Sequence, residues 1–241
     1  MFSASAELYD LIYAGIKDYG AEARAIAAIV RAAHPGARTL LDVACGTGEH
    51  ARLLAAEHGF TVEGLDLEPG FLRIAREKLG ADAVHQGDME RFALPRRYDV
   101  VACLFSSIGY LRTLDAVQRA LERFRAHLAP GGIVLVEPWF PPDVLEDGRV
   151  RVDTAAGEGV TVARLAHTAV EGRLSRLRFE YLIGRRAGIE HAVELHELGL
   201  FTTEELLACF AAAGLRATHD PAGPSGRGLF VARATTSIDQ P

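Results

Sequence analysis

The sequence predicts an α/β fold in which a doubly wound, mostly parallel β-sheet carries an appended antiparallel β layer. Three observations lead to this prediction. Apolar runs typical of buried strands alternate with helix-forming stretches between residues 39 and 137, which is the pattern of βαβ units. A glycine turn, Gly46-Thr47-Gly48, follows the first apolar run. From residue 160 onward, apolar and polar residues alternate with a period of two, as in half-buried antiparallel strands.

Length and composition limit what the chain can be. With 241 residues, of which 49% are hydrophobic and 24% charged, it can bury one sizeable core. Its net charge of −6 gives no general attraction to nucleic acid or anionic lipid, so we expect neither partner. No apolar stretch reaches the ~18 residues of a membrane span, and the N-terminus lacks the pattern of a signal peptide. Three cysteines without paired spacing predict neither disulfides nor a metal site. These features predict a cytoplasmic protein.

A helical segment precedes the first strand. Residues 4–33 are rich in helix-forming side chains, with expected breaks near Gly15 and Gly20, and the segment ends at a proline–glycine turn. Three tyrosines are spread through its first part, Tyr9, Tyr13 and Tyr19. They either pack an amphipathic lid or form aromatic walls over a bound ligand, and the sequence leaves both interpretations open. We assign residues 1–36 to a helical lid.

The central part of the chain supplies the parallel sheet. Strands are expected at five apolar runs, residues 39–44, 61–67, 83–88, 98–105 and 132–137. Helices are expected at residues 49–58, 70–79 and 114–127, each ending near a glycine or proline. Right-handed crossovers then give a twisted sheet covered on both faces. Residues 37–140, together with 201–234, are assigned to this core.

The appended layer is assigned to residues 141–200. Strands are expected at residues 160–169, 174–183 and 189–200, joined by glycine turns. In the middle strand, arginines and a glutamate share one face, which we expect to face solvent, with a binding site as the alternative. His191 and His196 fall on opposite faces of their strand, so a metal pair is not expected. We expect a surface position for His196, with a substrate contact as the alternative.

The C-terminal part completes the sheet. A helix over residues 203–213 begins with threonine caps and two glutamates in its first turn. Strands at residues 215–219 and 228–232 follow, and the glycine-rich connection 221–228 between them is too ordered in pattern for a linker. The tail, residues 235–241, is expected to be disordered.

Three aspartates mark the ends of successive strands, Asp42, Asp66 and Asp88. Each alone could cap a helix. Together, beside a topological switch point, they describe a binding crevice for a nucleotide-like cofactor, and Asp66 has the spacing at which such folds place a carboxylate on ribose hydroxyls. The glycine turn also permits an NAD-dependent oxidoreductase, although Ala51 replaces the third glycine of the dinucleotide fingerprint.

Four motifs make the sequence resemble the class I S-adenosylmethionine-dependent methyltransferases, namely Leu41-Asp42-Val43-Ala44-Cys45-Gly46-Thr47-Gly48, Gly64-Leu65-Asp66-Leu67, Gly87-Asp88-Met89 and Leu128-Ala129-Pro130-Gly131-Gly132. The resemblance implies a Rossmann-like seven-stranded sheet and S-adenosylmethionine as cofactor, with S-adenosylhomocysteine as product. It places Asp42 and the glycine turn at the amino-acid end, Asp66 at the ribose, and Asp88 with Met89 at the adenine. The other cofactor contacts it implies are Tyr19, Ala44, Cys45, Gly46, Gly48, Leu67 and Leu104. Ala44 replaces a glycine often found there, at a small expected cost because a methyl group is a small intrusion.

A narrower resemblance covers nearly the whole chain and depends on segments outside the cofactor motifs, residues 8–11, 15–19, 105–111, 136–139 and 223–230. Through them the sequence is similar to the N,N-dimethyltransferases of nucleotide-linked amino sugars, the desosamine-type enzymes of antibiotic pathways. The catalytic positions that this resemblance implies, around the sugar and its amine, are Tyr9, Ser107 and Tyr110. It assigns Arg227 to the diphosphate, and Glu137 and Trp139 to the sugar or its base, with core packing as the alternative for Trp139. Tyr110 replaces a histidine of some relatives, which puts an obligatory general base at that position in doubt.

The predicted function is an S-adenosylmethionine-dependent N-methyltransferase that dimethylates the amino group of a dTDP-linked deoxy amino sugar in antibiotic or other secondary-metabolite biosynthesis, as a homodimer. A small-molecule amine methyltransferase or an O-methyltransferase is the second candidate. An NAD-dependent oxidoreductase and a non-enzymatic ligand-binding module are the alternatives from other classes. The sequence leaves open whether the amine is at carbon 3 or carbon 4, and whether transfer stops after one methyl group.

Overall fold

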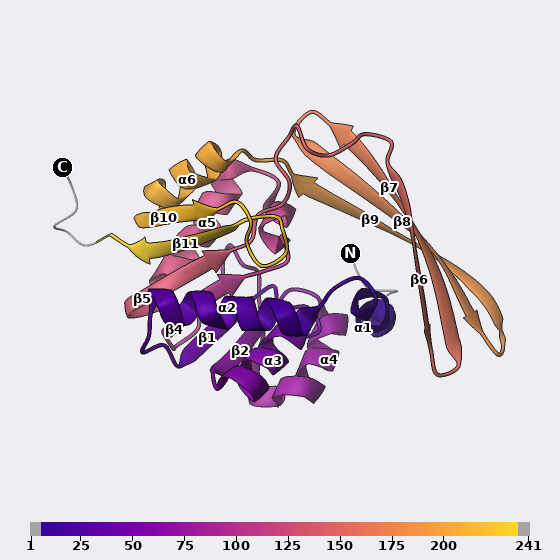
Figure 1. Cartoon of the computed structure of the whole chain (residues 1–241), viewed down its shortest axis with the longest axis horizontal. Helices are drawn as coiled ribbons and strands as arrows, with labels where there is room; N and C mark the ends of the chain where they lie inside the picture. Colours follow the sequence, from indigo (N-terminus) through magenta and orange to yellow (C-terminus); the bar gives the residue numbers. More distant parts are fainter. Residues whose placement is uncertain (1–5, 236–241) are drawn as a thin grey trace.

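Two β-sheets of different architecture make up the structure, a computed structural model that describes residues 6–235 (Figure 1). The larger sheet has seven strands in the order β10-β11-β5-β4-β1-β2-β3. Its strands are β1 (Thr39–Val43), β2 (Thr61–Asp66), β3 (Val84–Gln86), β4 (Tyr98–Cys103), β5 (Leu128–Val136), β10 (Leu215–Asp220) and β11 (Leu229–Ala234). Strands β1 to β5 are parallel, and β11 pairs antiparallel with both β5 and β10. The predicted doubly wound, mostly parallel sheet is therefore confirmed.

Helices cover both faces of this sheet. They are α2 (Tyr19–Ala33), α3 (Glu49–His58), α4 (Pro69–Leu79), α5 (Leu114–Ala126) and α6 (Thr203–Ala212). Helix α1 (Ala6–Ala14) lies between the two sheets (Figure 1), and the 3₁₀ helices are η1 (Ala81–Ala83) and η2 (Ser107–Leu111). Neighbouring residues of one strand enter opposite cores, because successive side chains of a strand point to opposite faces. Leu40 packs with α2 and α3 on one face, whereas Leu41 packs with α5 and α6 on the other.

The helix termini follow local capping chemistry. The Thr202 hydroxyl accepts a hydrogen bond from the Glu205 N–H, and the Glu205 carboxylate accepts one from the Thr202 N–H, which forms a capping box at the start of α6. The Asp18 carboxylate accepts a hydrogen bond from the Ala21 N–H at 2.8 Å and so starts α2 at Tyr19. The expected break near Gly20 was therefore wrong, since this glycine lies inside the first turn of α2.

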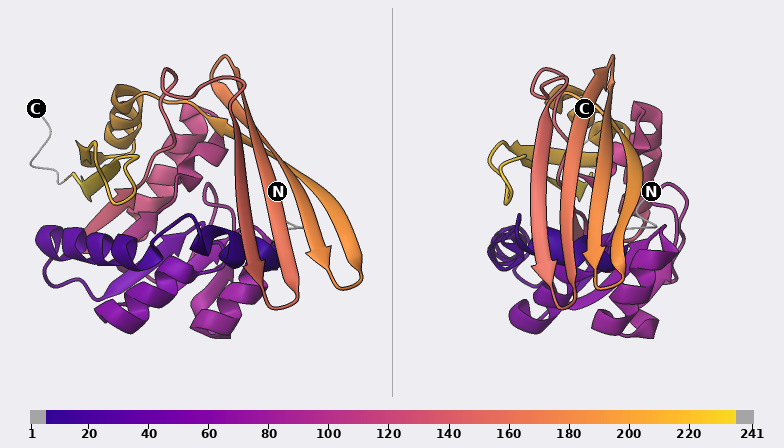
Figure 2. Two further views of the ribbon diagram at one scale, coloured as in Figure 1. Left: turned by 45° about the vertical axis from the view of Figure 1, so that its right-hand side comes forward. Right: turned by 90° about the vertical axis from the view of Figure 1, so that its right-hand side faces the viewer.

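The smaller sheet is antiparallel and contains β6 (Val150–Gly157), β7 (Val160–Glu171), β8 (Leu174–Arg185) and β9 (Gly188–Gly199) in sequential order (Figure 2). The sequence predicted only three of these strands. It missed β6 because most β6 residues are exposed, so the strand lacks a clear alternation of apolar and polar side chains. Apolar side chains on the inner face of β7 and β8 pack against Leu8 and Ile12 of α1. The polar face of β8 is exposed, as expected.

The order of the strands reverses between β1 and β4, which places a topological switch point at the carboxyl ends of these two strands. The glycine turn after β1, helix η2 after β4 and the loop 221–228 all gather at this edge, on the side that faces the antiparallel sheet (Figures 1 and 2). None of the helices within residues 6–235 is long and apolar enough to cross a membrane. The prediction of a disordered tail falls outside the described residues except for Thr235, whose N–H donates to the Gly214 carbonyl at 3.0 Å.

Candidate active site

The turn after β1 has left-handed backbone geometry at three positions. Gly46 and Gly48 have φ values of 56° and 78°, which glycine adopts at little cost. Ala44 also has a positive φ, 58°. The sequence analysis attributed the cost of this alanine to the volume of its methyl group. The cost instead comes from the backbone, because the left-handed region is unfavourable for any residue with a β-carbon.

A buried carboxylate stands directly before this turn. Asp42 is 2% exposed, and burial, together with the nearby Asp66, raises the pKa of its carboxyl group to about 7. No basic side chain within residues 6–235 forms an ion pair with it. A buried carboxylate without a cation is costly unless it is protonated or meets a cation from outside the chain. Asp42 is therefore suited to an amino-bearing ligand.

Asp66 shapes the turn from the neighbouring strand. Its carboxylate accepts hydrogen bonds from the Gly46 N–H at 2.8 Å and from the Glu68 N–H at 2.9 Å. Burial raises the pKa of Asp66 despite these two hydrogen bonds. The Asp66 backbone carbonyl also accepts a hydrogen bond from the Gly87 N–H at 2.9 Å, which joins the ends of β2 and β3.

A cavity opens at the carboxyl ends of β1 and β4. Eight residues that the sequence singled out line it, Tyr9, Tyr19, Asp42, Ala44, Cys45, Gly46, Leu104 and Ser107. Four others that it did not assign to the site also line it, Thr47, Glu49, His50 and Phe105. The structure thus brings together residues from the helical lid, from the glycine turn and from the segment after β4.

Other predicted cofactor residues lie outside this cavity. They are Gly48, Asp66, Leu67, Asp88 and Met89, which follow the same edge of the sheet from β1 towards the ends of β2 and β3. Leu67 is 52% exposed. The Asp88 carboxylate accepts a hydrogen bond from the Glu90 N–H at 2.9 Å and lies 3.9 Å from the Arg91 guanidinium. Asp88 thus caps a turn by binding the N–H two residues ahead. The sequence analysis had considered a related role for it, the capping of a helix.

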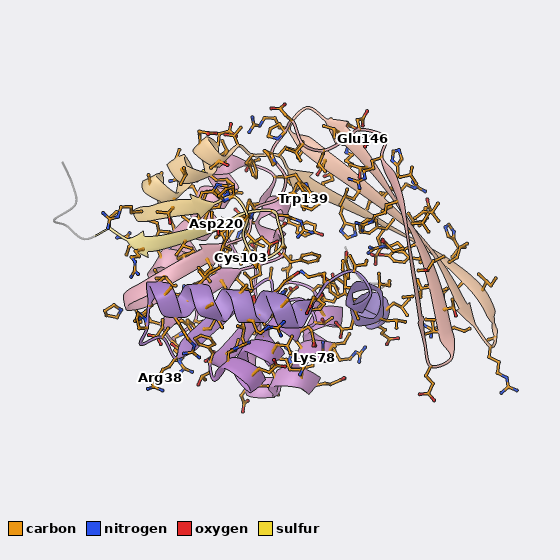
Figure 3. The ribbon with its side chains drawn as sticks, in the orientation of Figure 1. Arg38, Lys78, Cys103, Trp139, Glu146 and Asp220 are labelled. Carbon is orange, nitrogen blue, oxygen red and sulfur yellow. The ribbon has the colours of Figure 1, made fainter. Side chains whose placement is uncertain are left out.

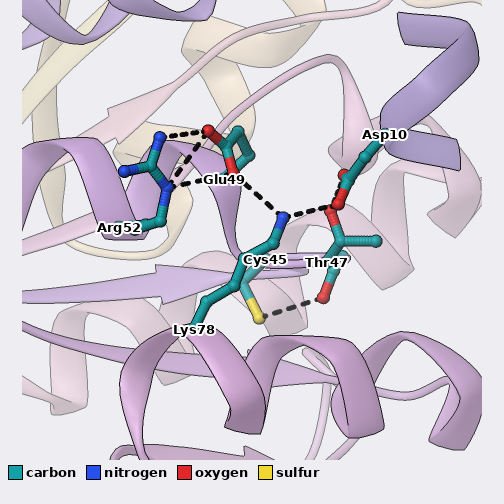
Figure 4. Close-up of polar contacts among 7 residues, drawn as sticks. Asp10, Cys45, Thr47, Glu49, Arg52 and Lys78 are labelled. Atoms are coloured by element: carbon teal, nitrogen blue, oxygen red, sulfur yellow. Dashed lines mark hydrogen bonds and ion pairs between the residues drawn. The ribbon is translucent and has the colours of Figure 1, made fainter. Parts of the chain in front are cut away.

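A polar network ties the lid to the glycine turn (Figure 4). The Lys78 ammonium lies 2.6 Å from the Asp10 carboxylate and 2.9 Å from that of Glu49. The Thr47 hydroxyl donates to Asp10 at 2.6 Å. Hydrogen bonds from Arg52 first, and then from Lys78, lower the pKa of Glu49 to about 2. The network holds α1 against α3 and α4, beside the cavity that Tyr9, Thr47 and Glu49 line.

Lys17, which the sequence analysis did not single out as a site residue, is buried beside the cavity. Its ammonium group lies 2.8 Å from the Glu22 carboxylate and 3.4 Å from the centre of the Phe105 ring. Glu22 also contacts the His50 imidazole at 2.8 Å. Burial lowers the pKa of Lys17, although Glu22 opposes this shift. The motif 15–19 contained the signal, but only the fold shows that Lys17 points at Phe105.

Arg227 lies on the same aromatic ring. Its guanidinium is 4.8 Å from the Phe105 ring centre and 3.1 Å from the Glu137 carboxylate. The Glu137 carboxylate also accepts hydrogen bonds from the Phe105 N–H, at 2.8 Å, and from the Ser225 hydroxyl. Phe105 has a left-handed φ of 50°, which Glu137 stabilises by binding its N–H. Glu137 therefore holds both the loop after β4 and the loop 221–228.

Trp139 borders a second cavity, of about 230 Å³, together with Phe140, Arg227 and residues of α6 and β11. Figure 3 labels Trp139 and Cys103 on the side of the larger sheet that faces the antiparallel layer. The Trp139 indole N–H donates to the Ser175 hydroxyl at 2.9 Å. Its polar edge is thus used in packing the two sheets together, while its ring lines the cavity.

The three predicted catalytic residues converge from two elements. Tyr9 of α1 packs against Tyr13 at 4.4 Å and against Phe71 at 5.0 Å between ring centres. Ser107 and Tyr110 lie three residues apart in η2, so their side chains share one face of this 3₁₀ helix. Tyr110 is 38% exposed. The burial of the rest of this residue, and next the neighbouring Tyr13, raise the pKa of its hydroxyl group above the usual range.

The prediction for His196 was wrong. This histidine is 3% exposed, because the inner face of β9 packs against η2 of the larger unit instead of facing solvent. Its Nδ1 lies 3.2 Å from the Tyr110 hydroxyl. His191, on the opposite face of β9, is exposed and bound to Glu180 at 2.6 Å.

Comparison with known proteins identifies the family. The methyltransferase domain family matches residues 40–132. The chain is 48% identical over 228 residues to the dTDP-3-amino-3,6-dideoxy-alpha-D-glucopyranose N,N-dimethyltransferase of Streptomyces fradiae, covering 94% of this chain and 89% of that relative. The chain belongs to the dTDP-amino-sugar N,N-dimethyltransferases. This assignment excludes the oxidoreductase and the non-enzymatic binding module that the sequence had left open, and makes the protein an S-adenosylmethionine-dependent sugar N-methyltransferase.

Solved structures agree with this assignment. The structure matches crystalline DesVI of Streptomyces venezuelae with a TM-score of 0.90 and 43% identity, covering 95% of this chain and 98% of that chain. It matches CalS10, an amino pentose methyltransferase from Micromonospora echinaspora solved with bound S-adenosylmethionine, with a TM-score of 0.84 and 41% identity, covering 95% and 97% of the two chains. S-adenosylmethionine is accordingly the cofactor of this dimethyltransferase.

Proposed function

We propose that this dimethyltransferase transfers two methyl groups from S-adenosylmethionine to the exocyclic amine of a dTDP-linked deoxy amino sugar, in the biosynthesis of an antibiotic or a related secondary metabolite. The observation that carries the proposal is the position of Phe105. Phe105 lines the cavity next to Asp42, and Arg227, which lies against the Phe105 ring, lines the second cavity. A cofactor site and a site suited to a phosphorylated ligand thus meet at one side chain.

The residues around the first cavity fit the cofactor. The buried Asp42 carboxylate, which has no cationic partner within residues 6–235, matches its ammonium group. The backbone groups of the glycine turn let a ligand approach closely. Asp66 and Asp88 follow along the edge for the ribose and the adenine. The bound cofactor supplies an electrophilic methyl group on a sulfonium centre.

The groups around the second cavity fit a sugar nucleotide. A guanidinium binds phosphate oxygens with two parallel hydrogen bonds, and Arg227 presents one beside the aromatic rings of Trp139 and Phe140. The buried ammonium of Lys17 also lies against the Phe105 ring, at 3.4 Å from its centre. Two cations with few acidic neighbours other than Glu22 and Glu137 favour an anionic ligand here.

The reaction requires positioning more than acid–base chemistry. Methyl transfer to nitrogen is an in-line displacement, so it needs a neutral nitrogen held in line with the methyl group and a site that excludes water. We propose that Tyr9 and Ser107, which line the first cavity, orient the sugar and its amine together with Tyr110, which lies three residues after Ser107 in η2. We propose that α1 closes the site, since Lys78 ties Asp10 of α1 to Glu49 and the Thr47 hydroxyl ties Asp10 to the glycine turn.

The test of this function is product analysis. Purified protein is incubated with S-adenosylmethionine and a panel of dTDP sugars that carry the amine at carbon 3, at carbon 4 or not at all. The masses of the products are measured by mass spectrometry. We expect a gain of two methyl groups on one of the amino sugars and none on the sugar without an amine. A panel without methylated products, or methylation of a hydroxyl group in the amine-free sugar, would contradict the proposal.

The cofactor site is tested separately by calorimetry with S-adenosylhomocysteine. We expect binding by the unaltered protein and markedly weaker binding by Asp88→Ala, because Asp88 is proposed to contact the adenine. Asp82→Ala is the matched control, since Asp82 is an exposed aspartate of the neighbouring helix η1. Equal affinities of all three proteins would remove Asp88 from the site.

We further propose that the protein is a homodimer that assembles through the outer face of the antiparallel sheet, in the cytoplasm. Several apolar side chains are exposed on this outer face, including Val152, Leu165, Leu182, Val193 and Leu195. Register places Leu165 beside Val152 on one side and Glu180 on the other, with Val193 next in the row. We infer that these apolar side chains, which flank the charged residues of β8, take part in a protein interface. Three free cysteines support the reducing compartment.

This arrangement supports a division of the chain into four parts. Residues 1–36 would serve as the lid, residues 37–140 with 201–234 as the cofactor-binding core, and residues 141–200 as a layer for substrate and dimerisation, followed by the tail from residue 235. Within the described residues, the lid and the layer meet where Tyr13 binds Arg164 at 3.1 Å. Light scattering of the purified protein, compared with Leu195→Asp, tests the dimer, since a charge in the interface should yield monomers.

A further inference from the structure

A chain of buried polar groups leads away from the proposed amine position into the antiparallel sheet. The Tyr110 hydroxyl lies 3.2 Å from His196 Nδ1, and His196 Nε2 lies 3.7 Å from the Glu194 carboxylate. The side chains of His196 and Glu194 are 1% and 2% exposed. The Tyr181 hydroxyl donates to Glu194 at 3.0 Å and fixes its position. Of these four side chains, only that of Tyr110 is exposed to solvent. A ligand can therefore reach this series of polar groups at Tyr110.

We propose that Tyr110, His196 and Glu194 remove the proton from the amino group of the substrate, with Tyr110 touching the amine and His196 receiving the proton through it. The proposal rests on the proposed function, because it needs an amine beside Tyr110. It concerns a step that dimethylation cannot avoid. An amino sugar is largely an ammonium ion near neutral pH, the nitrogen lone pair is needed for attack, and each transfer leaves a proton on the nitrogen that must depart before the next.

The step balances in atoms and charge. One N–H bond of the ammonium breaks, and its proton joins the Tyr110 oxygen while the O–H proton of Tyr110 moves to His196 Nδ1. The nitrogen keeps the electron pair of the broken bond and becomes neutral. Tyr110 ends as a neutral phenol, and the imidazole of His196 becomes an imidazolium. The nearby Glu194 carboxylate stabilises this new positive charge.

The surroundings of Tyr110 favour transfer of a proton to His196 over ionisation of the tyrosine. Burial, and next the neighbouring Tyr13, raise the pKa of Tyr110, so its hydroxyl stays protonated and passes a proton on instead of ionising. The Phe179 ring covers the imidazole at 5.0 Å between ring centres. Other ionisable groups that act on Tyr110 include Tyr9 and Tyr13 of α1, Asp66 at the end of β2, and Tyr181 of β8.

The variant His196→Asn distinguishes a role of His196 in proton transfer from a role in packing. In His196→Asn the amide oxygen takes the place of Nδ1 and still accepts a hydrogen bond from Tyr110, but it cannot accept a proton. We expect kcat to fall about 100-fold, the size of a general-base contribution, with an unchanged KM for the sugar nucleotide and an unchanged Kd for S-adenosylhomocysteine. Tyr110→Phe breaks the chain at its first member and should lower kcat to a similar extent.

The pH profile provides a readout that packing would not move. In the unaltered protein kcat should rise with pH, because only a neutral imidazole can accept the proton from Tyr110. Glu194→Gln removes the charge that stabilises the imidazolium and should shift this rise to lower pH. His191→Asn is the matched control on the exposed face of the same strand and should leave the profile unchanged.

Three outcomes overturn the proposal. The first is a His196→Asn protein that keeps kcat within about twofold across pH 6–9, even if its melting temperature falls, since that result leaves His196 a purely structural role. The second is a Glu194→Gln profile that coincides with that of the unaltered protein. The third is an unaltered protein that methylates no amino sugar, which removes the proposed function and this inference together. The first two leave the proposed function standing.

Discussion

Proton release on cofactor binding is the most direct test of the chemistry at Asp42. Burial, and then the neighbouring Asp66, raise the pKa of this carboxyl group to about 7 in the absence of ligand. An ammonium group in contact with Asp42 would favour the ionised form and lower that pKa. Binding of S-adenosylhomocysteine, which carries the same ammonium group, should therefore release a proton below pH 7.

The magnitude follows from this pKa. Well below pH 7 most of the ligand-free protein carries a proton on Asp42, so affinity should weaken about tenfold for each pH unit below 7 and level off above it. Between pH 8 and pH 5.5 the Kd should rise roughly 30-fold. At pH 6 the protein should release about 0.9 protons for each ligand bound.

The same shift has a consequence for stability. The native state binds more protons than the unfolded chain between pH 3.8, where an unperturbed aspartate titrates, and about pH 7, so stability falls as pH rises through this window. Three pH units correspond to about 4 kcal/mol. Asp42→Asn removes this slope, and without ligand it should be more stable than the unaltered protein at pH 8, with a melting temperature about 10 °C higher.

The assay is titration calorimetry with S-adenosylhomocysteine in two buffers of different ionisation enthalpy, at several pH values from 5.5 to 8. Other ionisable side chains, His50 among them, also line the cavity, so the comparison with Asp42→Asn isolates the aspartate. Asp82→Asn is the control for a change of charge at an exposed site. A Kd that stays constant from pH 5.5 to 8, with no protons released, would refute the assignment of Asp42 to the ammonium group.

Three further predictions concern Arg227 in the loop 221–228, Ala44 in the turn after β1, and Lys78, which binds the lid helix α1. Arg227→Ala should raise KM for the sugar nucleotide about 10- to 100-fold and leave the Kd of S-adenosylhomocysteine unchanged; Arg216→Ala, on an exposed position of β10, is the control, and an unchanged KM would make Arg227 merely structural. Ala44→Gly should stabilise the protein by about 1 kcal/mol, seen as a higher melting temperature, because φ is 58° at this position; a lower melting temperature would contradict this reasoning. Lys78→Met should destabilise the protein by about 1–2 kcal/mol above pH 4.5 and progressively less as pH falls towards 2, because the lowered pKa of Glu49 stabilises the fold only while Glu49 is ionised in the unfolded chain. Denaturant titrations at pH 7 and pH 3 measure this difference, and an equal loss at both would show that the ion pair is not its cause.

Much of the architecture could be read from local sequence patterns. An apolar run followed by a helix with its own cap determines a βαβ unit within a few dozen residues. For this reason the parallel strands β1 to β5 and the edge that carries Asp42 and the glycine turn were predicted. Strand β6 was missed because its residues are mostly exposed. Its place in the sheet comes from pairing with β7, where Asp153 meets the buried Arg164 at 2.6 Å.

The sequence by itself determined the class of fold and the cofactor edge, because both depend on residues close together in the chain. Only the tertiary structure decided what the second sheet does to the site. It turned His196 inward against Tyr110, 86 residues away in sequence, and brought Lys17 and Arg227 to the same Phe105 ring. Contacts of this range depend on how two sheets pack, and no periodicity within a single strand or helix encodes that packing.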